Sequence, residues 1–226
     1  MSKQYAIALE HDASYAAEDF LRNDALNHCM VSLAQHSAWQ EPCTLLIGPE
    51  GCGKTHMLHA IAAQTDAVFL SLHEDNATPL ESLFTAGSLH IVDDALGHIP
   101  ERLAQAINHA RADGQALLLT MHRHPKQADI ALPDLRSRLC AMQALYYPNA
   151  DDALLEAVMA KRFSDVQWRV SHEVVRYLVQ RLPRSFGALH AFIQHADKRA
   201  MQAGRALTLP FARELLSDFD GEAYDA

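Results

Sequence analysis

The sequence of 226 residues contains no apolar run long enough to cross a bilayer, which takes about 20 residues. Its first residues, MSKQYAIALEHDAS, have neither a basic flank nor a long apolar stretch, so they do not resemble a secretory signal. No two cysteines form a C-x-x-C pair; the four are Cys29, Cys43, Cys52 and Cys140. Scattered thiols are typical of a reducing compartment. We therefore expect a cytoplasmic protein that makes no contact with membranes.

Positive charge is also scarce. The formal net charge is −9, from 28 acidic and 19 basic residues. Binding the phosphates of nucleic acid needs clustered Lys and Arg, and no such cluster stands out. The charge balance therefore argues against a general nucleic-acid binder, and we expect any contact with DNA to be indirect. The apolar content of 49% is nevertheless that of an ordinary globular protein with a full core.

The fourteen histidines do not form a metal-binding pattern. His56 and His59 lie one turn apart on an expected helix, and His122 and His124 flank Arg123. Neither pair has Cys, Asp or Glu at ligand spacing. Surface and packing roles are therefore favoured for these histidines over a metal site.

Short apolar segments alternate with amphipathic helical segments as far as Pro148. The expected strands are residues 44–47, 67–72, 89–92, 116–120 and 144–147. The expected helices are residues 18–36, 55–64 and 99–112. This alternation predicts an α/β fold, in which a parallel five-stranded sheet is covered by helices on both faces. Ligands of such sheets bind at the carboxyl ends of the strands.

After Pro148 the strand signal ends. Helical patterns cover residues 151–163, 171–182, 184–203 and 208–217. We therefore expect three parts: an N-terminal segment (1–17), an α/β nucleotide-binding base (18–148) and an all-helical lid domain (149–226).

A phosphate-binding motif directly follows the first expected strand. Gly48, Pro49, Glu50, Gly51, Cys52, Gly53, Lys54 and Thr55 match G-x-x-x-x-G-K-[ST] in full. The glycines let successive amides turn toward one anion, and the start of the next helix adds its positive dipole end. Lys54 is expected to reach the β- and γ-phosphates of ATP or ADP, and the Thr55 hydroxyl to bind Mg²⁺. His56 is expected to lie beside the same nucleotide.

An acidic pair ends the third expected strand. Asp93 is placed to accept from magnesium-bound water, and Asp94 to lie near the attacking water, where many P-loop ATPases use glutamate. Acidic residues at a strand end also form simple turns, so this assignment depends on the preceding motif.

Three further features resemble the DnaA branch of the AAA+ superfamily of P-loop NTPases. The run LPDLRSRL at 132–139 resembles the arginine-finger segment of that family, and PRSFGAL at 183–189 resembles its sensor-2 segment. An Asp-Asp acidic pair is also typical of these proteins. The resemblance implies that Arg138 acts in trans as an arginine finger, that Arg136 supports it, and that Arg184 reaches the phosphates from the lid.

Within that branch the sequence resembles the Hda-like regulators, which place one AAA+ module behind a short peptide. It shows no segment resembling the DNA-reading helix-turn-helix domain of DnaA. Residues 4–9, QYAIAL, fit the clamp-binding pattern Gln-x-x-(Leu/Ile)-x-Leu, in which Gln4, Ile7 and Leu9 would dock on the sliding clamp. Six residues alone also fit a disordered tail or an edge strand.

The resemblance implies a negative regulator of replication initiation. Bound to the clamp, it would supply Arg138 to ATP held by DnaA and stimulate hydrolysis there. Its own ATPase is expected to be weak at most, because Thr120-Met121-His122-Arg123 stands where relatives carry a sensor-1 residue. The main alternative is an autonomous AAA+ ATPase of the helicase-loader or transposition-helper type. A second alternative is an adaptor whose P-loop only stabilises the fold. Each of these hypotheses allows the protein to form homo-oligomers.

Overall fold

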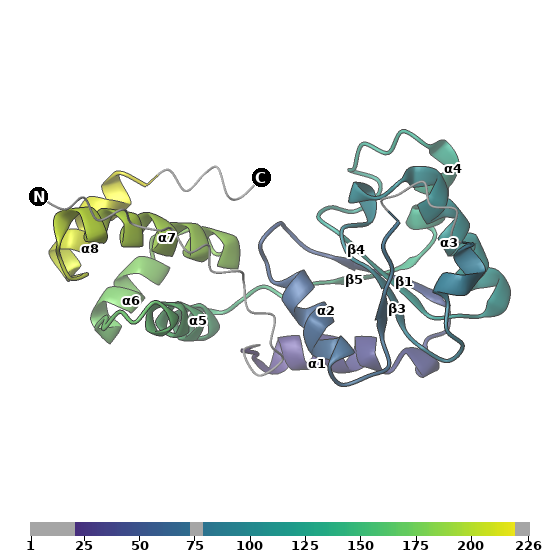
Figure 1. Cartoon of the computed structure of the whole chain (residues 1–226), viewed down its shortest axis with the longest axis horizontal. Helices are drawn as coiled ribbons and strands as arrows, with labels where there is room; N and C mark the ends of the chain where they lie inside the picture. The colour runs from purple at the N-terminus through teal and green to yellow at the C-terminus, as the bar shows by residue number, and fades with distance from the viewer. Residues whose placement is uncertain (1–20, 73–78, 220–226) are drawn as a thin grey trace, which may run out of the picture.

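The structure of the protein, a computed structural model, describes residues 21–72 and 79–219. Figure 1 shows two bodies side by side, an α/β base and a helical domain, joined by the chain that leaves strand β5. The peptide expected to bind the clamp, with Gln4, Ile7 and Leu9, lies outside the described residues. None of the described helices is both long and apolar enough to span a membrane.

The base is built on a five-stranded parallel sheet with the order β2-β3-β4-β1-β5. The strands are β1 (Cys43–Ile47), β2 (Val68–Phe69), β3 (His90–Val92), β4 (Leu117–Met121) and β5 (Gln143–Tyr146). Every residue of β1 and β4 is buried, as their nearly continuous apolar sequences require at the centre of a sheet covered on both faces. The predicted fold class is confirmed.

Helices cover both faces of this sheet (Figure 1). Helices α1 (Asp24–Ala34) and α2 (Lys54–Ala62) pack on one face, and α3 (Pro100–Asp113) and α4 (Pro133–Cys140) on the other. Alternate side chains of each strand enter opposite cores, since successive residues of a strand point to opposite faces. Leu46 and Leu118 join the α1–α2 core, whereas Leu45 and Leu119 join the α3–α4 core. Short 3-10 turns lie at His36–Ala38, Leu80–Leu83 and Ala95–Gly97.

The second body has its own core. It consists of α5 (Asp152–Asp165), α6 (His172–Val179), α7 (Phe186–Ala203) and α8 (Leu209–Ser217). Phe163, Phe192 and Phe211 are fully buried at its centre. Gly204 ends α7 in the left-handed conformation (φ 59°), as expected from its position after the helical pattern.

Two element boundaries differ clearly from the expectation. Helix α1 begins at Asp24 rather than at residue 18, because Asn23 is extended and its side chain accepts the Leu26 N–H at 2.9 Å. Strand β2 is shorter than the expected 67–72. It lies at the edge of the sheet, and beyond it the Leu72 N–H donates to His98 Nδ1 at 3.1 Å instead of to a neighbouring strand.

Candidate nucleotide-binding site

The loop between β1 and α2 lies at the carboxyl end of the central strand. Gly53 adopts a left-handed conformation (φ 101°) and leads directly into α2, so the first N–H groups of that helix are free of helical partners. Gly48 has no room for a side chain, because an added Cβ would lie 2.7 Å from Tyr147 Cβ. These contacts explain why both positions are glycine.

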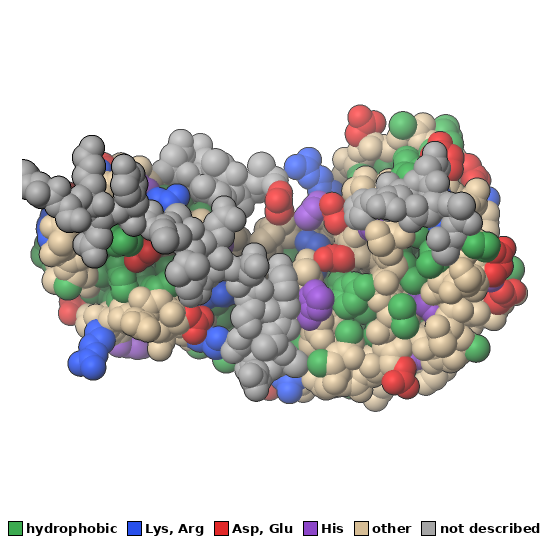
Figure 2. All heavy atoms as spheres, viewed as in Figure 1, with side chains coloured by type: hydrophobic (Ala, Val, Ile, Leu, Met, Phe, Trp, Pro, Cys, Tyr) green, Lys and Arg blue, Asp and Glu red, His purple; other side chains and the backbone are tan. Residues whose placement is uncertain are grey.

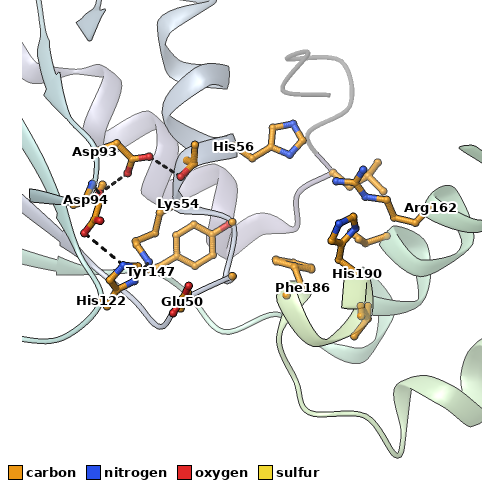
Figure 3. A pocket seen from close by; sticks show the side chains of 18 of the residues that line it. Glu50, Lys54, His56, Asp93, Asp94, His122, Tyr147, Arg162, Phe186 and His190 are labelled. Carbon is orange, nitrogen blue, oxygen red and sulfur yellow. Dashed lines mark hydrogen bonds and ion pairs between the residues drawn. The ribbon is translucent and has the colours of Figure 1, made fainter. Parts of the chain in front are cut away.

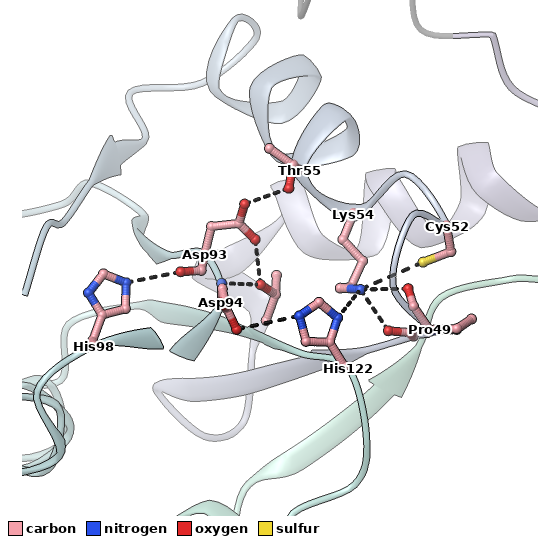
Figure 4. Close-up of polar contacts among 10 residues, drawn as sticks. Pro49, Cys52, Lys54, Thr55, Asp93, Asp94, His98 and His122 are labelled. Atoms are coloured by element: carbon pink, nitrogen blue, oxygen red, sulfur yellow. Dashed lines mark hydrogen bonds and ion pairs between the residues drawn. The ribbon is translucent and has the colours of Figure 1, made fainter. Parts of the chain in front are cut away.

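Lys54 is buried at the base of this loop. Its Nζ donates to the main-chain carbonyls of Gly48 (2.6 Å) and Pro49 (2.9 Å), and it lies 3.8 Å from Cys52 Sγ (Figure 4). Cys52 is buried too, and burial raises the pKa of its thiol although the Lys54 charge lowers it. A buried ammonium held by carbonyl dipoles attracts an anion strongly.

The two residues expected to hold magnesium are in contact. Thr55 Oγ1 donates to Asp93 Oδ2 at 2.6 Å (Figure 4). Mg²⁺ prefers oxygen ligands, and it is commonly held by one or two protein oxygens together with substrate phosphates and water. A hydroxyl and a carboxylate at this distance fit that donor set. Within the described ranges, no group of three or more His, Cys, Asp or Glu side chains forms a metal site by itself.

Thr120 fixes the acidic pair. Its hydroxyl donates to Asp93 Oδ1 and accepts the Asp94 N–H at 2.8 Å, and the residue is fully buried at the end of β4. Asp94 itself is left-handed (φ 48°) and directs its carboxylate toward His122, 3.5 Å from Nε2. His122 Nδ1 in turn lies 3.5 Å from Lys54 Nζ. A chain of polar contacts thus connects the acidic pair with the phosphate loop.

A cavity of about 450 Å³ lies between the base and the helical domain. That volume is within the range of pockets that hold small ligands. Figure 2 shows acidic, basic and histidine side chains gathered where the two bodies meet. The base lines the cavity with Glu50, Gly51, Gly53, Lys54, Thr55, His56, Asp93 and Asp94, so most of the residues predicted to bind nucleotide and Mg²⁺ meet there.

The helical domain contacts the phosphate loop directly. The Gly187 N–H, in the first turn of α7, donates to the Gly51 carbonyl at 3.0 Å. A Cβ added to Gly51 would lie 2.8 Å from Gly187 Cα, so only glycine allows this approach. Phe186 and His190 extend the contact along the cavity wall (Figure 3).

The arginine that lines the cavity from the helical domain is not the predicted one. Arg184 is exposed and forms an ion pair with Asp152, outside the cavity lining. Arg162 lines it instead, and burial together with the charge of Arg162 lowers the pKa of His190 beside it (Figure 3). Val158 and Lys161 also line the cavity. Together with Arg162 they occupy positions i, i+3 and i+4 of α5, which lie on one face of a helix. That spacing is the sequence signal that could have identified Arg162.

The two arginines of α4 also lie outside the cavity lining. Arg138 Nε donates to Asp134 Oδ2 at 2.7 Å, and its guanidinium also donates to Asn108 Oδ1. Arg136 is exposed and donates to the Lys126 carbonyl at 3.3 Å. Arg136 and Arg138 therefore lie on a part of the surface that is separate from the cavity.

The two bodies match two families. Residues 44–121 match the family described as "ATPase family associated with various cellular activities (AAA)". Residues 152–216 match the family described as "Hda, lid domain". The chain is an Hda-like, DnaA-related AAA+ protein. Its P-loop base and its lid domain thus correspond to the two bodies of the structure.

Whole-chain comparisons agree with this assignment. An uncharacterized protein of Haemophilus influenzae is 27% identical over 232 residues, which cover 96% of this Hda-like chain and 100% of the relative. Domain III of the replication initiation protein DnaA from Thermotoga maritima matches with a TM-score of 0.70 at 17% identity, over 92% of this chain and 98% of that one. AMPPCP-bound DnaA from Aquifex aeolicus matches with a TM-score of 0.57 at 17% identity, over 81% of this chain and 65% of that one. The structural matches show a shared fold.

Proposed function

We propose that this Hda-like protein binds ATP or ADP with Mg²⁺ in the cavity between base and lid. The observation that carries the proposal is the convergence of buried Lys54 with the Thr55–Asp93 contact at the start of α2. Lys54 and the loop amides would meet the phosphate charge, while Thr55 and Asp93 would hold the ion between protein and phosphates. The AMPPCP bound to a DnaA of the same fold supports this assignment.

Magnesium dependence tests the role of Asp93. Wild-type protein titrated calorimetrically with ATP is expected to bind more tightly with Mg²⁺ than with EDTA. The Asp93→Asn variant is expected to lose most of that difference, about tenfold in Kd, because an amide oxygen carries no charge for the ion. Asp129→Asn, at a residue outside the cavity lining, is a matched control that should behave as wild type. If Asp93→Asn keeps the full magnesium effect, the assignment is wrong.

We further propose that the protein acts as a negative regulator of replication initiation. Docked on the sliding clamp through Gln4, Ile7 and Leu9, it would supply Arg138 to ATP on DnaA, with Arg136 in support. The Hda-type lid domain and the position of both arginines outside the protein's own cavity support this model. Arg184, now paired with Asp152, would contact phosphate only after leaving that ion pair. DNA would be reached only through the clamp, in line with the net charge of −9.

The clamp interaction has a direct test. Replacing Gln4, Ile7 and Leu9 with alanine is expected to abolish recovery of the protein on immobilised sliding clamp, because the three side chains supply the register and the apolar anchors of the peptide. Affinity for ADP should stay at the wild-type value, since Lys54, Thr55 and Asp93, which are proposed to hold the phosphates and Mg²⁺, are unchanged. Replacing Lys3, which stands outside the pattern, serves as the control. Undiminished recovery of the triple variant on the clamp contradicts the peptide assignment.

A further inference from the structure

Tyr147 lies along the inner side of the phosphate loop. It is the first residue after β5, and its N–H donates to the Ile47 carbonyl at 2.7 Å, so it continues the pairing with β1. A Cβ added to Gly48 would lie 2.7 Å from Tyr147 Cβ, and one added to Gly53 would lie 2.8 Å from the hydroxyl oxygen. The ring therefore extends from the first glycine of the loop to the last, and it lines the cavity (Figure 3).

The hydroxyl of this tyrosine lacks a partner. Tyr147 is only 6% exposed, and across the described ranges of the chain its Oη finds no hydrogen-bond partner. Burial raises the pKa of Tyr147, so the group keeps its proton and remains a donor. Folded proteins rarely bury a hydroxyl without a partner, because its lost hydration is then uncompensated. The group therefore calls for an acceptor that the described residues do not supply.

The place of the hydroxyl indicates which acceptor. It is next to Gly53, the residue before Lys54, and the Phe186 ring of the lid lies on the same side of Gly53, 3.3 Å from an added Cβ. Lys54 Nζ lies toward the other end of the ring, where it donates to the Gly48 and Pro49 carbonyls. The donors along this side of the loop are thus the Lys54 ammonium, the amides at the start of α2 and one neutral hydroxyl. Such a set favours an anion with several oxygens.

We propose that the Tyr147 hydroxyl donates a hydrogen bond to the phosphate chain of the bound adenine nucleotide. The inference rests on the proposed nucleotide site and adds to it a donor from the β5 side, outside the P-loop motif. A neutral donor adds affinity for phosphate oxygens without another buried positive charge beside Lys54. Because an aromatic ring sets its position, the donor is fixed before the nucleotide arrives.

The test removes one oxygen atom. Tyr147→Phe is titrated with ADP and Mg²⁺ beside wild type and the matched variant Tyr146→Phe, which alters the neighbouring tyrosine, 63% exposed. Tyr147→Phe is expected to raise the Kd for ADP by about tenfold or more, the typical effect of a charge-assisted hydrogen bond. Tyr146→Phe should leave it unchanged. The affinity for inorganic pyrophosphate, a phosphate chain without nucleoside, is titrated directly and should also fall in Tyr147→Phe alone.

Thermal unfolding without nucleotide supplies a second readout. Tyr147→Phe should melt at or above the wild-type temperature, since it deletes a buried hydroxyl without a partner. A lowered melting temperature would show that the hydroxyl serves the fold, and the proposal would then fail. If Tyr147→Phe kept the wild-type affinity for ADP or for pyrophosphate, the role of the hydroxyl would be refuted, and the nucleotide site itself would stand. If wild type bound no ADP, the site itself and this inference would both be refuted.

Discussion

Replacing Arg138 with alanine is expected to abolish the proposed acceleration of ATP hydrolysis by DnaA. An arginine supplied in trans to a transferring phosphoryl group contributes about 10³- to 10⁵-fold in rate, so the stimulated rate should fall to that of DnaA alone. The fold should persist, because the pair of Arg138 with Asp134 lies within one helix at the surface, and such pairs contribute about 0–1 kcal/mol. Affinity for ADP should also persist, since Arg138 is outside the cavity lining.

The assay for Arg138 uses ATP-bound DnaA with clamp-loaded DNA. Arg138→Lys keeps the charge but loses the planar fork, so it should also fail to stimulate hydrolysis. Arg136→Ala, two residues away on the same helix, is expected to have a smaller effect. Hydrolysis by the Hda-like protein alone gives the baseline, which should be low because Asp94 is turned toward His122. Stimulation by Arg138→Ala equal to wild type would exclude the arginine-finger role.

Lys54→Ala is expected to weaken ADP binding by about 100-fold or more. The variant removes the buried cation that is proposed to face the phosphates, and loss of one partner from a buried charge pair costs about 3–5 kcal/mol. It also frees the Gly48 and Pro49 carbonyls, so a modest loss of thermal stability should accompany it. Titration calorimetry with ADP and thermal unfolding measure the two effects separately.

The same variant separates a nucleotide-dependent regulator from an adaptor whose P-loop only stabilises the fold. Below its melting temperature, Lys54→Ala should fail to stimulate DnaA if nucleotide sets the active shape. Full stimulation by the folded variant would favour the adaptor. Lys126→Ala is the matched control, because Lys126 is exposed and outside the cavity lining. Unaltered ADP affinity in Lys54→Ala would contradict the nucleotide site.

The phosphate loop was predictable from sequence because its chemistry is local. Eight consecutive residues supply the turn, the free amides, Lys54 and Thr55, and the apolar strand before them fixes where they lie. Asp93 was predictable for a related reason: the carboxyl ends of parallel strands meet at one edge of the sheet. Asp93 after β3 therefore lies 2.6 Å from Thr55, although β4 separates β3 from β1. Buried strands and capped helices likewise gave clear patterns, so the fold class follows from sequence.

Contacts between base and lid were not predictable in the same way. Which lid arginine faces the cavity depends on how the lid packs against the base, and sequence resemblance favoured Arg184 where the structure places Arg162. The contacts of Thr120 depend on the spacing between β3 and β4, and the sequence left open whether Thr120, His122 or neither of them serves at the sensor-1 position. The buried hydroxyl of Tyr147 is invisible in a sequence, because an apolar strand followed by two tyrosines does not show which of them faces inward.

The hydrogen bond from Gly187 to Gly51 has a mechanical consequence. It attaches the first turn of α7 to the loop that would surround the phosphates, and neither residue has a side chain to keep the two backbones apart. A hinge motion of the helical domain away from the base must break this bond and release the loop at the same moment. We therefore expect release of a bound nucleotide and movement of the helical domain to be coupled through this one backbone contact.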